Sequence, residues 1–256
     1  MPLVYYQPYT YPMNVLITTI GSLFLTITIH LAVAQQPSLD GSWKLTQANG
    51  QAVTGMEVIA ICQDNYFMFG QYRPNGSFIS AGGGAYQLVD DQFQITYDFN
   101  TENSAQVRVP QQYTAELTQD RFSFQNQTAG KQTWERVSEE TTPLTGTWLF
   151  AARVDEEGNE GERRGPGPRM TVKILSGGRF QWAAFNYETK EFSGTGGGTY
   201  EADNSTYTEN IEFFSRDDSR VGGSLSFQYR RTGNDWYHEG KNSRGEPLHE
   251  VWTQME

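Results

Sequence analysis

The stretch FSGTGGGTYEADNSTYTENIEFF, residues 192–214, repeats without a gap the pattern of FISAGGGAYQLVDDQFQITYDFN, residues 78–100. The glycine triplets of the two stretches coincide, and so do the aromatic residues on both sides of them. Self-similarity at a long, fixed spacing is the sequence signature of a chain made of repeated structural units. The sequence therefore predicts that one folding unit is built twice.

The similarity extends to both ends of the unit. LDGSWKL at residues 39–45 matches LTGTWLF at residues 144–150, and QTWERV at residues 132–137 matches EVWTQM at residues 250–255. Each copy thus opens with Gly-x-Trp and closes with a strand-like run that carries a tryptophan. The matching ends indicate that each copy is a complete unit.

These matches predict the domain organisation. Residues 66–124 run alongside residues 180–238 at one constant offset, so the copies differ mainly in loop lengths. The polar segment SEETTP, residues 138–143, ends in a proline, which discourages continued regular structure. We expect a first domain over residues 39–137, a linker over residues 138–143 and a second domain over residues 144–256.

Composition and run lengths favour an all-β fold. Aromatic residues make up 14% of the chain and it has 26 glycines, while short β-branched or aromatic runs recur about every ten residues between turn signals. Eight antiparallel strands joined by hairpins suit an up-and-down barrel, which has no exposed edges. Two tandem antiparallel barrels are therefore predicted. In the second copy the expected strands cover residues 146–153, 169–175, 179–187, 191–200, 207–215, 221–229, 235–240 and 247–254.

The glycine triplets have a mechanical interpretation in such a barrel. Glycine weakens a strand unless the chain must bend sharply or another backbone approaches closely, as at barrel corners. A phosphate-binding loop is the alternative, but GTGGGT lacks the third glycine of a dinucleotide fingerprint and a strand-like run follows it. We expect the triplets to shape the barrels.

The paired Gly-x-Trp motifs resemble the calycin superfamily, which includes the lipocalins, fatty-acid-binding proteins and avidin-like barrels. The resemblance implies that Trp43 and Trp148 plug one end of each barrel, and that a basic residue covers each plug. Arg136 is placed to do so in the first copy, whereas Gln254 stands at that position in the second. The whole chain is also similar to uncharacterised exported, lipocalin-like proteins of Bacteroidota, which implies a fold and a location but no activity.

The N-terminal residues 1–34 predict export to the periplasm or the extracellular space. They contain no Lys, Arg, Asp or Glu, and VLITTIGSLFLTITIHLAVAQQ from Val15 onward ends its apolar run in Ala-Val-Ala. This pattern is typical of a signal peptide. An uncleaved membrane anchor formed by residues 15–34 is the alternative, and either Met1 or Met13 can be the true start.

Charge and cysteine content limit the partners. The net charge is −11, so a nucleic-acid partner would need a basic stripe, and the only basic cluster is Arg163, Arg164 and Arg169. The single Cys62 excludes an intramolecular disulfide. We expect no nucleic-acid partner, and membrane contact only through an uncleaved N-terminal segment.

Ionisable residues of the second copy are predicted to face its interior. Side chains alternate between the faces of a strand, and Glu209 alternates with Tyr207 and Ile211. His238 likewise shares a face with Trp236, and Glu250 shares one with Trp252.

The first copy has no such charges at the matching positions, where Ile95, Phe124 and Gln132 stand. Burying an ionised group costs several kcal/mol unless it is compensated. The second copy is therefore the place to look for a site.

Three interpretations of this polar trio remain open. A small-molecule pocket would combine Glu209, His238 and Glu250 with Trp182, Tyr200 and Tyr229, and would hold an apolar or amphipathic molecule or a sugar fragment. A satisfied polar network inside an envelope interaction or scaffold module is the second interpretation. An enzyme that uses His238 and Glu209 as acid and base is the third. No metal or cofactor is predicted, since no close spacing of metal ligands marks one.

The loop VDEEGNEGERRGPGPR, residues 154–169, is about nine residues longer than its counterpart. Its composition predicts a solvated loop over the open mouth of the second barrel. It serves either as a lid or as a tolerated insertion.

Overall fold

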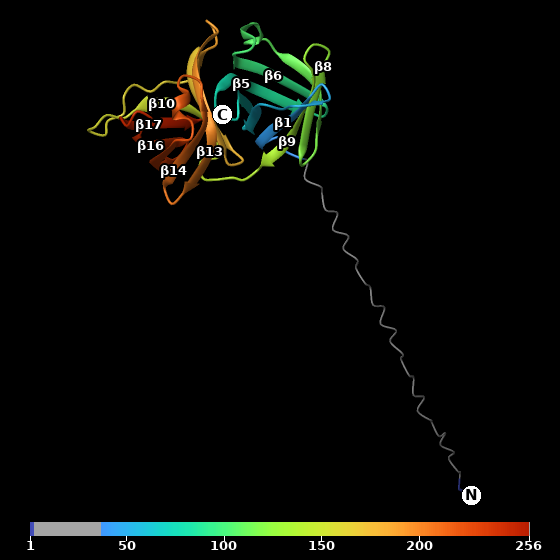
Figure 1. The fold of residues 1–256 in the computed structure, drawn as a ribbon. Coiled ribbons are helices and arrows are strands. Elements are labelled where there is room, and N and C mark those ends of the chain that lie inside the picture. The colour runs from blue at the N-terminus through green and yellow to red at the C-terminus, as the bar shows by residue number, and fades with distance from the viewer. Residues whose placement is uncertain (3–36, 256) are drawn as a thin grey trace. The chain divides into compact units, whose positions relative to one another are not determined.

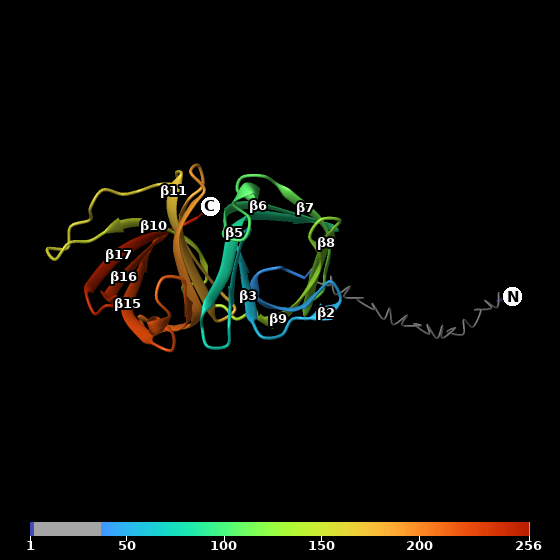
Figure 2. The same ribbon diagram turned by 45° about the horizontal axis from the view of Figure 1, so that its top comes forward.

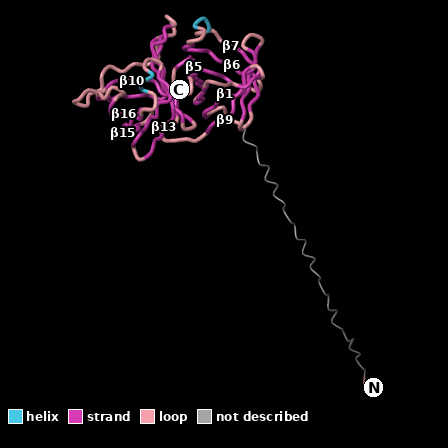
Figure 3. Tube along the Cα trace, in the orientation of Figure 1, coloured by secondary structure: helices cyan, strands magenta, loops and turns pink. Residues whose placement is uncertain are grey.

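The computed structural model describes residues 1–2 and 37–255. The predicted signal peptide or anchor, residues 1–34, lies almost entirely outside the described residues. Within the described part, no helix has the length and apolar character needed to cross a membrane. Strands dominate residues 37–255, where two short 3-10 turns are the only helical elements (Figure 3).

The first repeat is a closed antiparallel barrel. Its strands follow chain order around the barrel, and β1 pairs with both β3 and β9 to close it, while the short β2 pairs beside β1. Figure 2 shows β3, β5, β6, β7 and β8 succeeding one another around a ring. The strands are β1 (Gly41–Ala48), β2 (Gln51–Ala52), β3 (Glu57–Gln63), β4 (Tyr66–Tyr72), β5 (Phe78–Val89), β6 (Gln92–Asn100), β7 (Gln111–Leu117), β8 (Arg121–Asn126) and β9 (Gly130–Ser138).

The second repeat closes in the same way from eight antiparallel strands, with β10 paired to β11 and β17. The prediction of two tandem up-and-down barrels is confirmed (Figure 1). The strands are β10 (Gly146–Arg153), β11 (Arg169–Ser176), β12 (Arg179–Asn186), β13 (Glu191–Asp203), β14 (Thr206–Phe214), β15 (Ser224–Thr232), β16 (Asp235–Lys241) and β17 (Pro247–Gln254).

One detail of the sequence alignment was wrong. Phe67 lies opposite Gly84, and Phe180 lies opposite Gly198. Phe180 therefore corresponds to Phe67 and not to Tyr66, because the second copy has one more residue in the hairpin loop that follows.

The strand expected over residues 221–229 begins only at Ser224. The 3-10 turn η2 (Asp218–Arg220) precedes it, with the Asp217 side chain accepting a hydrogen bond from the Ser219 N–H. The first copy has the same device, since Asn103 caps η1 (Ser104–Gln106). A capped 3-10 turn satisfies its own backbone hydrogen-bonding groups and has no alternating pattern of side chains. The turn was therefore not distinguished from the strand that follows it.

The glycine triplets sit where the strand register shifts and backbones crowd. The shift falls between Gly83 and Gly84 in the first barrel and at the matching step in the second. A Cβ atom on Gly84 would lie 2.0 Å from the Thr96 carbonyl oxygen, and one on Gly198 would lie 2.0 Å from the Asn210 carbonyl oxygen. The mechanical interpretation of the triplets is confirmed, because only glycine allows this close approach.

A buried tryptophan closes one end of each barrel. The indole N–H of Trp43 donates to the Leu39 carbonyl at 2.8 Å, and that of Trp148 donates to the Leu144 carbonyl at 2.9 Å. The Arg136 guanidinium lies 4.1 Å from the centre of the Trp43 ring.

In the second barrel the covering cation comes from a different strand. Arg231 of β15 lies 4.8 Å from the Trp148 ring centre and donates to the Gln254 side chain at 3.1 Å. Gln254 thus supports the cover instead of forming it.

Both barrels belong to one compact unit, Pro37–Glu256. A single apolar cluster contains Met68 and Phe99 from the first barrel and Val172 and Phe185 from the second, and the Phe99 and Phe185 rings stack at 5.1 Å. Strand β11 contributes alternate residues to this interface, so both of its faces are buried.

We expect Arg136→Ala to lower the free energy of unfolding more than Arg231→Ala, by about 1–2 kcal/mol. Arg136 donates to the carbonyls of Ser38, Asp40 and Gln119, which lose their partner. Arg231 is exposed and donates over longer distances of 3.1–3.5 Å to Pro143, Gly233 and Gln254. Urea unfolding followed by tryptophan fluorescence measures the difference. Equal losses for the two variants would contradict it.

Candidate ligand site in the second barrel

The two barrel interiors differ in what fills them. In the first, aromatic rings pack the lumen around Phe93, whose ring centre lies 5.2 Å from those of both Phe122 and Phe124. The second contains a cavity of about 880 Å³. The hollow barrel is the one whose interior contains the buried Lys173, Glu209 and His238.

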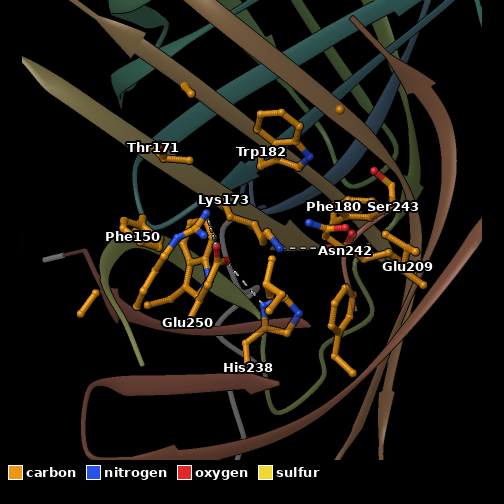
Figure 4. Close-up of a pocket in the computed structure, with 18 of the residues that line it drawn as sticks. Phe150, Thr171, Lys173, Phe180, Trp182, Glu209, His238, Asn242, Ser243 and Glu250 are labelled. Atoms are coloured by element: carbon orange, nitrogen blue, oxygen red, sulfur yellow. Dashed lines mark hydrogen bonds and ion pairs between the residues drawn. The ribbon is translucent and has the colours of Figure 1, made fainter. Parts of the chain in front are cut away.

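The cavity wall combines apolar and polar side chains in similar measure, and several of the polar ones lie buried at its base. All eight strands of the second barrel contribute to it, and the long β10–β11 loop lines its mouth. Figure 4 shows side chains from opposite walls converging on Lys173, Glu209, His238 and Glu250. The apolar and aromatic lining includes Phe150, Phe180, Trp182, Ile211, Phe214, Leu225, Phe227, Leu248 and Trp252.

A buried ion pair spans the base of the cavity. The Lys173 ammonium donates to Glu209 Oε1 at 2.8 Å, and the Tyr207 hydroxyl donates to the same oxygen at 2.8 Å. Lys173 and Glu209 are only 4% and 5% exposed. The ammonium also lies 4.9 Å from the Trp252 ring centre and 5.3 Å from that of Trp236. Charge pairing and aromatic faces together compensate for the loss of water.

His238 is the unsatisfied member of the group. It is 2% exposed, and neither ring nitrogen has a hydrogen-bond partner among the described residues. Aromatic rings surround it, with Phe227 at 4.0 Å and Trp236 at 5.2 Å between ring centres. Burial, reinforced by the Lys173 charge, holds the pKa of His238 well below its usual 6.5. The imidazole is therefore neutral, and in the wall of the cavity it keeps one donor and one acceptor without a partner among the described residues.

Glu250 lies beside His238 without a close hydrogen bond to it. Its Oε2 is 3.9 Å from His238 Nδ1, and its Oε1 is 3.9 Å from the Arg153 guanidinium. Burial raises the pKa of Glu250, while the charges of Lys173 and Arg153 act against that rise. A ligand hydroxyl or amide can bridge the gap between the carboxyl group and the imidazole.

The structure brings together four of the six predicted site residues. Glu209, His238, Glu250 and Trp182 all line the cavity. Tyr200 and Tyr229 do not belong to the lining. The Tyr200 hydroxyl lies 3.0 Å from the Thr142 hydroxyl near the plugged end, and Tyr229 packs, partly buried, against the aromatic core.

Lys173 was not among the site residues predicted from the sequence. Its strand reads RMTVKILS, in which Val172 and Ile174 face the other barrel, so no exposed polar face reveals the alternation. A comparison of the two copies could have identified Lys173, because its equivalent in the first copy is Ala60. Lys173 lies opposite Trp182 and Trp148 just as Ala60 lies opposite Phe69 and Trp43.

The register confirms the other equivalences between the copies. Tyr86 pairs with Ile95 as Tyr200 pairs with Glu209. Phe124 and Gln132 face each other in the first barrel, as His238 and Glu250 do in the second. Every polar group at the base of the cavity therefore replaces an apolar or amide side chain of the filled barrel.

The long β10–β11 loop is tied to the barrel wall. Arg163 donates to Glu160 and to Asp235 of β16, both at 2.8 Å, and the Tyr237 hydroxyl donates to Glu160 at 2.6 Å. The loop residues Gly161–Arg164 border the cavity. The loop is thus part of the mouth, as its length and composition predicted.

Comparisons with known proteins leave the activity open. No family model matches the chain, and no curated protein matches it. A crystal structure of an uncharacterized protein from Bacteroides eggerthii DSM 20697 is similar to 39% of this chain and 99% of its own, with 20% sequence identity and a TM-score of 0.30.

We expect Lys173→Met to lower the free energy of unfolding by about 3–5 kcal/mol, because it leaves the Glu209 carboxylate buried without its cation. The double variant Lys173→Met/Glu209→Leu should recover most of this loss. Urea unfolding at neutral pH measures both. A loss below about 1 kcal/mol for the single variant would show that the pair is not needed.

We expect His238→Phe to be more stable than the natural protein, by an amount that grows below pH 6.5. The unfolded chain takes up a proton on His238 there, whereas the low pKa prevents uptake in the folded state. Falling pH therefore removes stability from the natural protein by up to about 1.4 kcal/mol per pH unit. Unfolding curves between neutral and mildly acidic pH measure the gap. A gap that stays constant would mean that the imidazole charges freely in the folded state.

Proposed function

We propose that the chain is an exported small-molecule-binding protein whose site is the cavity of the second barrel. The observation that carries the proposal is a cavity of about 880 Å³, lined by aromatic and polar side chains, with the unpartnered, buried His238 in its wall. Small-molecule sites are concave and combine apolar and aromatic side chains with convergent polar groups. An apolar or amphipathic molecule or a sugar fragment fits this description.

The calycin-like plugs support the proposed lipocalin-like barrel type, and the apolar N-terminal run supports the proposed export. Each barrel has Gly-x-Trp on its first strand, an indole donating to a backbone carbonyl and an arginine over the ring. Export to the periplasm or extracellular space rests on the signal-like residues 1–34.

The two other candidate functions have less support. A scaffold without a ligand fits a barrel that its own side chains fill, which describes the first barrel and not the second. An acid/base enzyme would need His238 and Glu209 within hydrogen-bond reach. Instead, Glu209 Oε1 accepts from Lys173 and Tyr207, and no hydrogen bond joins the two candidates within the part of the chain that the structure describes.

Native mass spectrometry of the protein purified from cells that naturally make it tests the proposal. We expect a small molecule to co-purify at one per chain, and to be lost in Thr171→Trp, which fills the cavity from β11. Thr114→Trp on the exposed face of β7 is the matched control and should retain the molecule. His238→Phe should retain less than the natural protein.

Thermal unfolding of each variant separates loss of ligand from loss of fold. A natural protein that carries no added mass would contradict the proposal. So would a folded Thr171→Trp variant that keeps its ligand.

A further inference from the structure

The charge of the cavity differs from that of the protein. The chain has a net charge of −11, yet five cations and three carboxylates line the cavity. The cations are Arg153, Arg163, Arg164, Lys173 and Arg216, and the carboxylates are Glu162, Glu209 and Glu250.

Three arginines of the lining are available to a ligand. The Arg153 side chain is 76% exposed and approaches Glu250 only to 3.9 Å. Arg164 lies over the Phe150 ring at 5.9 Å, and Arg216 donates to the Ser193 carbonyl at 2.6 Å. None of the three forms an ion pair within 3.5 Å among the described residues, and all three stand at the open end of the barrel. We call Arg153, Arg164 and Arg216 the mouth arginines.

Most other charges of the mouth loops are already paired or lie outside the lining. Arg163 is neutralised by Glu160 and Asp235. Asp217 pairs with Arg220 at 3.0 Å, and Arg244 pairs with Glu246 at 3.0 Å. The acidic loop residues Asp155, Glu156 and Glu157 do not line the cavity, whereas Glu162 does.

The base of the cavity has no free cation for an anionic group. Lys173 is paired with Glu209, and Glu250 adds a second carboxylate, so a buried anion would find no counterion there and would lose its hydration. His238 has one donor and one acceptor without a partner among the described residues, as a hydroxyl or amide requires. The negative charge of a ligand is therefore accommodated at the mouth.

We propose that the ligand is an amphipathic anion, with its carboxylate, sulfonate or sulfate at the mouth arginines, its apolar body against the aromatic wall, and an uncharged polar end at His238. This inference rests on the proposed function and names the ligand class for the same site. Guanidinium groups suit such anions because their donors match the planar or tetrahedral oxygens.

Two fluorescent dyes with the same ring skeleton test the anion. Anilinonaphthalene sulfonate carries a sulfonate and phenylnaphthylamine carries no charge. We expect the sulfonate to bind about tenfold more tightly at low salt, as three exposed charge contacts allow. The preference should shrink as salt is added, because exposed charges are screened.

Variants locate the preference on the protein. Arg153→Gln/Arg164→Gln/Arg216→Gln should bind both dyes about equally. The control Arg73→Gln/Arg121→Gln/Lys131→Gln removes the same charge from exposed positions of the first barrel and should keep the preference. Thr171→Trp should abolish binding of both dyes.

Three results would overturn the inference. Equal binding of the two dyes by the natural protein, with both lost in Thr171→Trp, would remove the anion and leave the proposed function standing. A preference that survives in the mouth-arginine variant would move the anion site elsewhere. Binding of both dyes that persists in a folded Thr171→Trp variant would defeat the proposed function together with this inference.

Discussion

The buried ion pair between Lys173 and Glu209 is the interaction on which the second barrel depends. It joins β11 to β14 through the lumen, and the Tyr207 hydroxyl completes it. Because the two charges compensate each other, the barrel can remain hollow and polar at its base without an isolated buried charge. The neutral state of His238 follows in part from the same ammonium group, which disfavours a second positive charge nearby.

The two copies of the duplicated unit differ in how their interiors are filled. The first barrel is packed with interlocking rings around Phe93, an arrangement that maximises buried apolar surface. The second gives up part of that packing for a cavity. Their shared cluster of buried residues, which includes Met68 and Val172, joins the hollow barrel to the solid one. A hollow, less densely packed barrel can therefore be kept within a stable unit.

Much of the fold could be predicted because the sequence contains the same folding unit twice. The glycine triplets, the Gly-x-Trp plugs and the strand order needed only the internal comparison and the alternation of side chains. The one-residue error at Phe180 arose because a hairpin loop changed length while the aromatic pattern on either side stayed similar. The late start of β15 was missed because a capped 3-10 turn has no period-2 signature.

The site was only partly predictable, for two physical reasons. Alternation tells which face a side chain takes, but not its level along the barrel axis, so Tyr200 was expected in a pocket although its hydroxyl lies near the plug. Lys173 was missed because its strand is buried on both faces, and an alternating pattern needs one exposed face to be visible. Only Ala60 in the other copy marks Lys173 as unusual.

The double burial of β11 also has an evolutionary consequence. One face of β11 lines the cavity, and the other packs against the first barrel. Such a strand has few solvent-facing positions at which substitutions cost little. Strands such as β15, with many exposed residues, can vary without such a penalty. Descendants of this chain should therefore change mainly in the mouth loops and the outer strands, while β11 changes least.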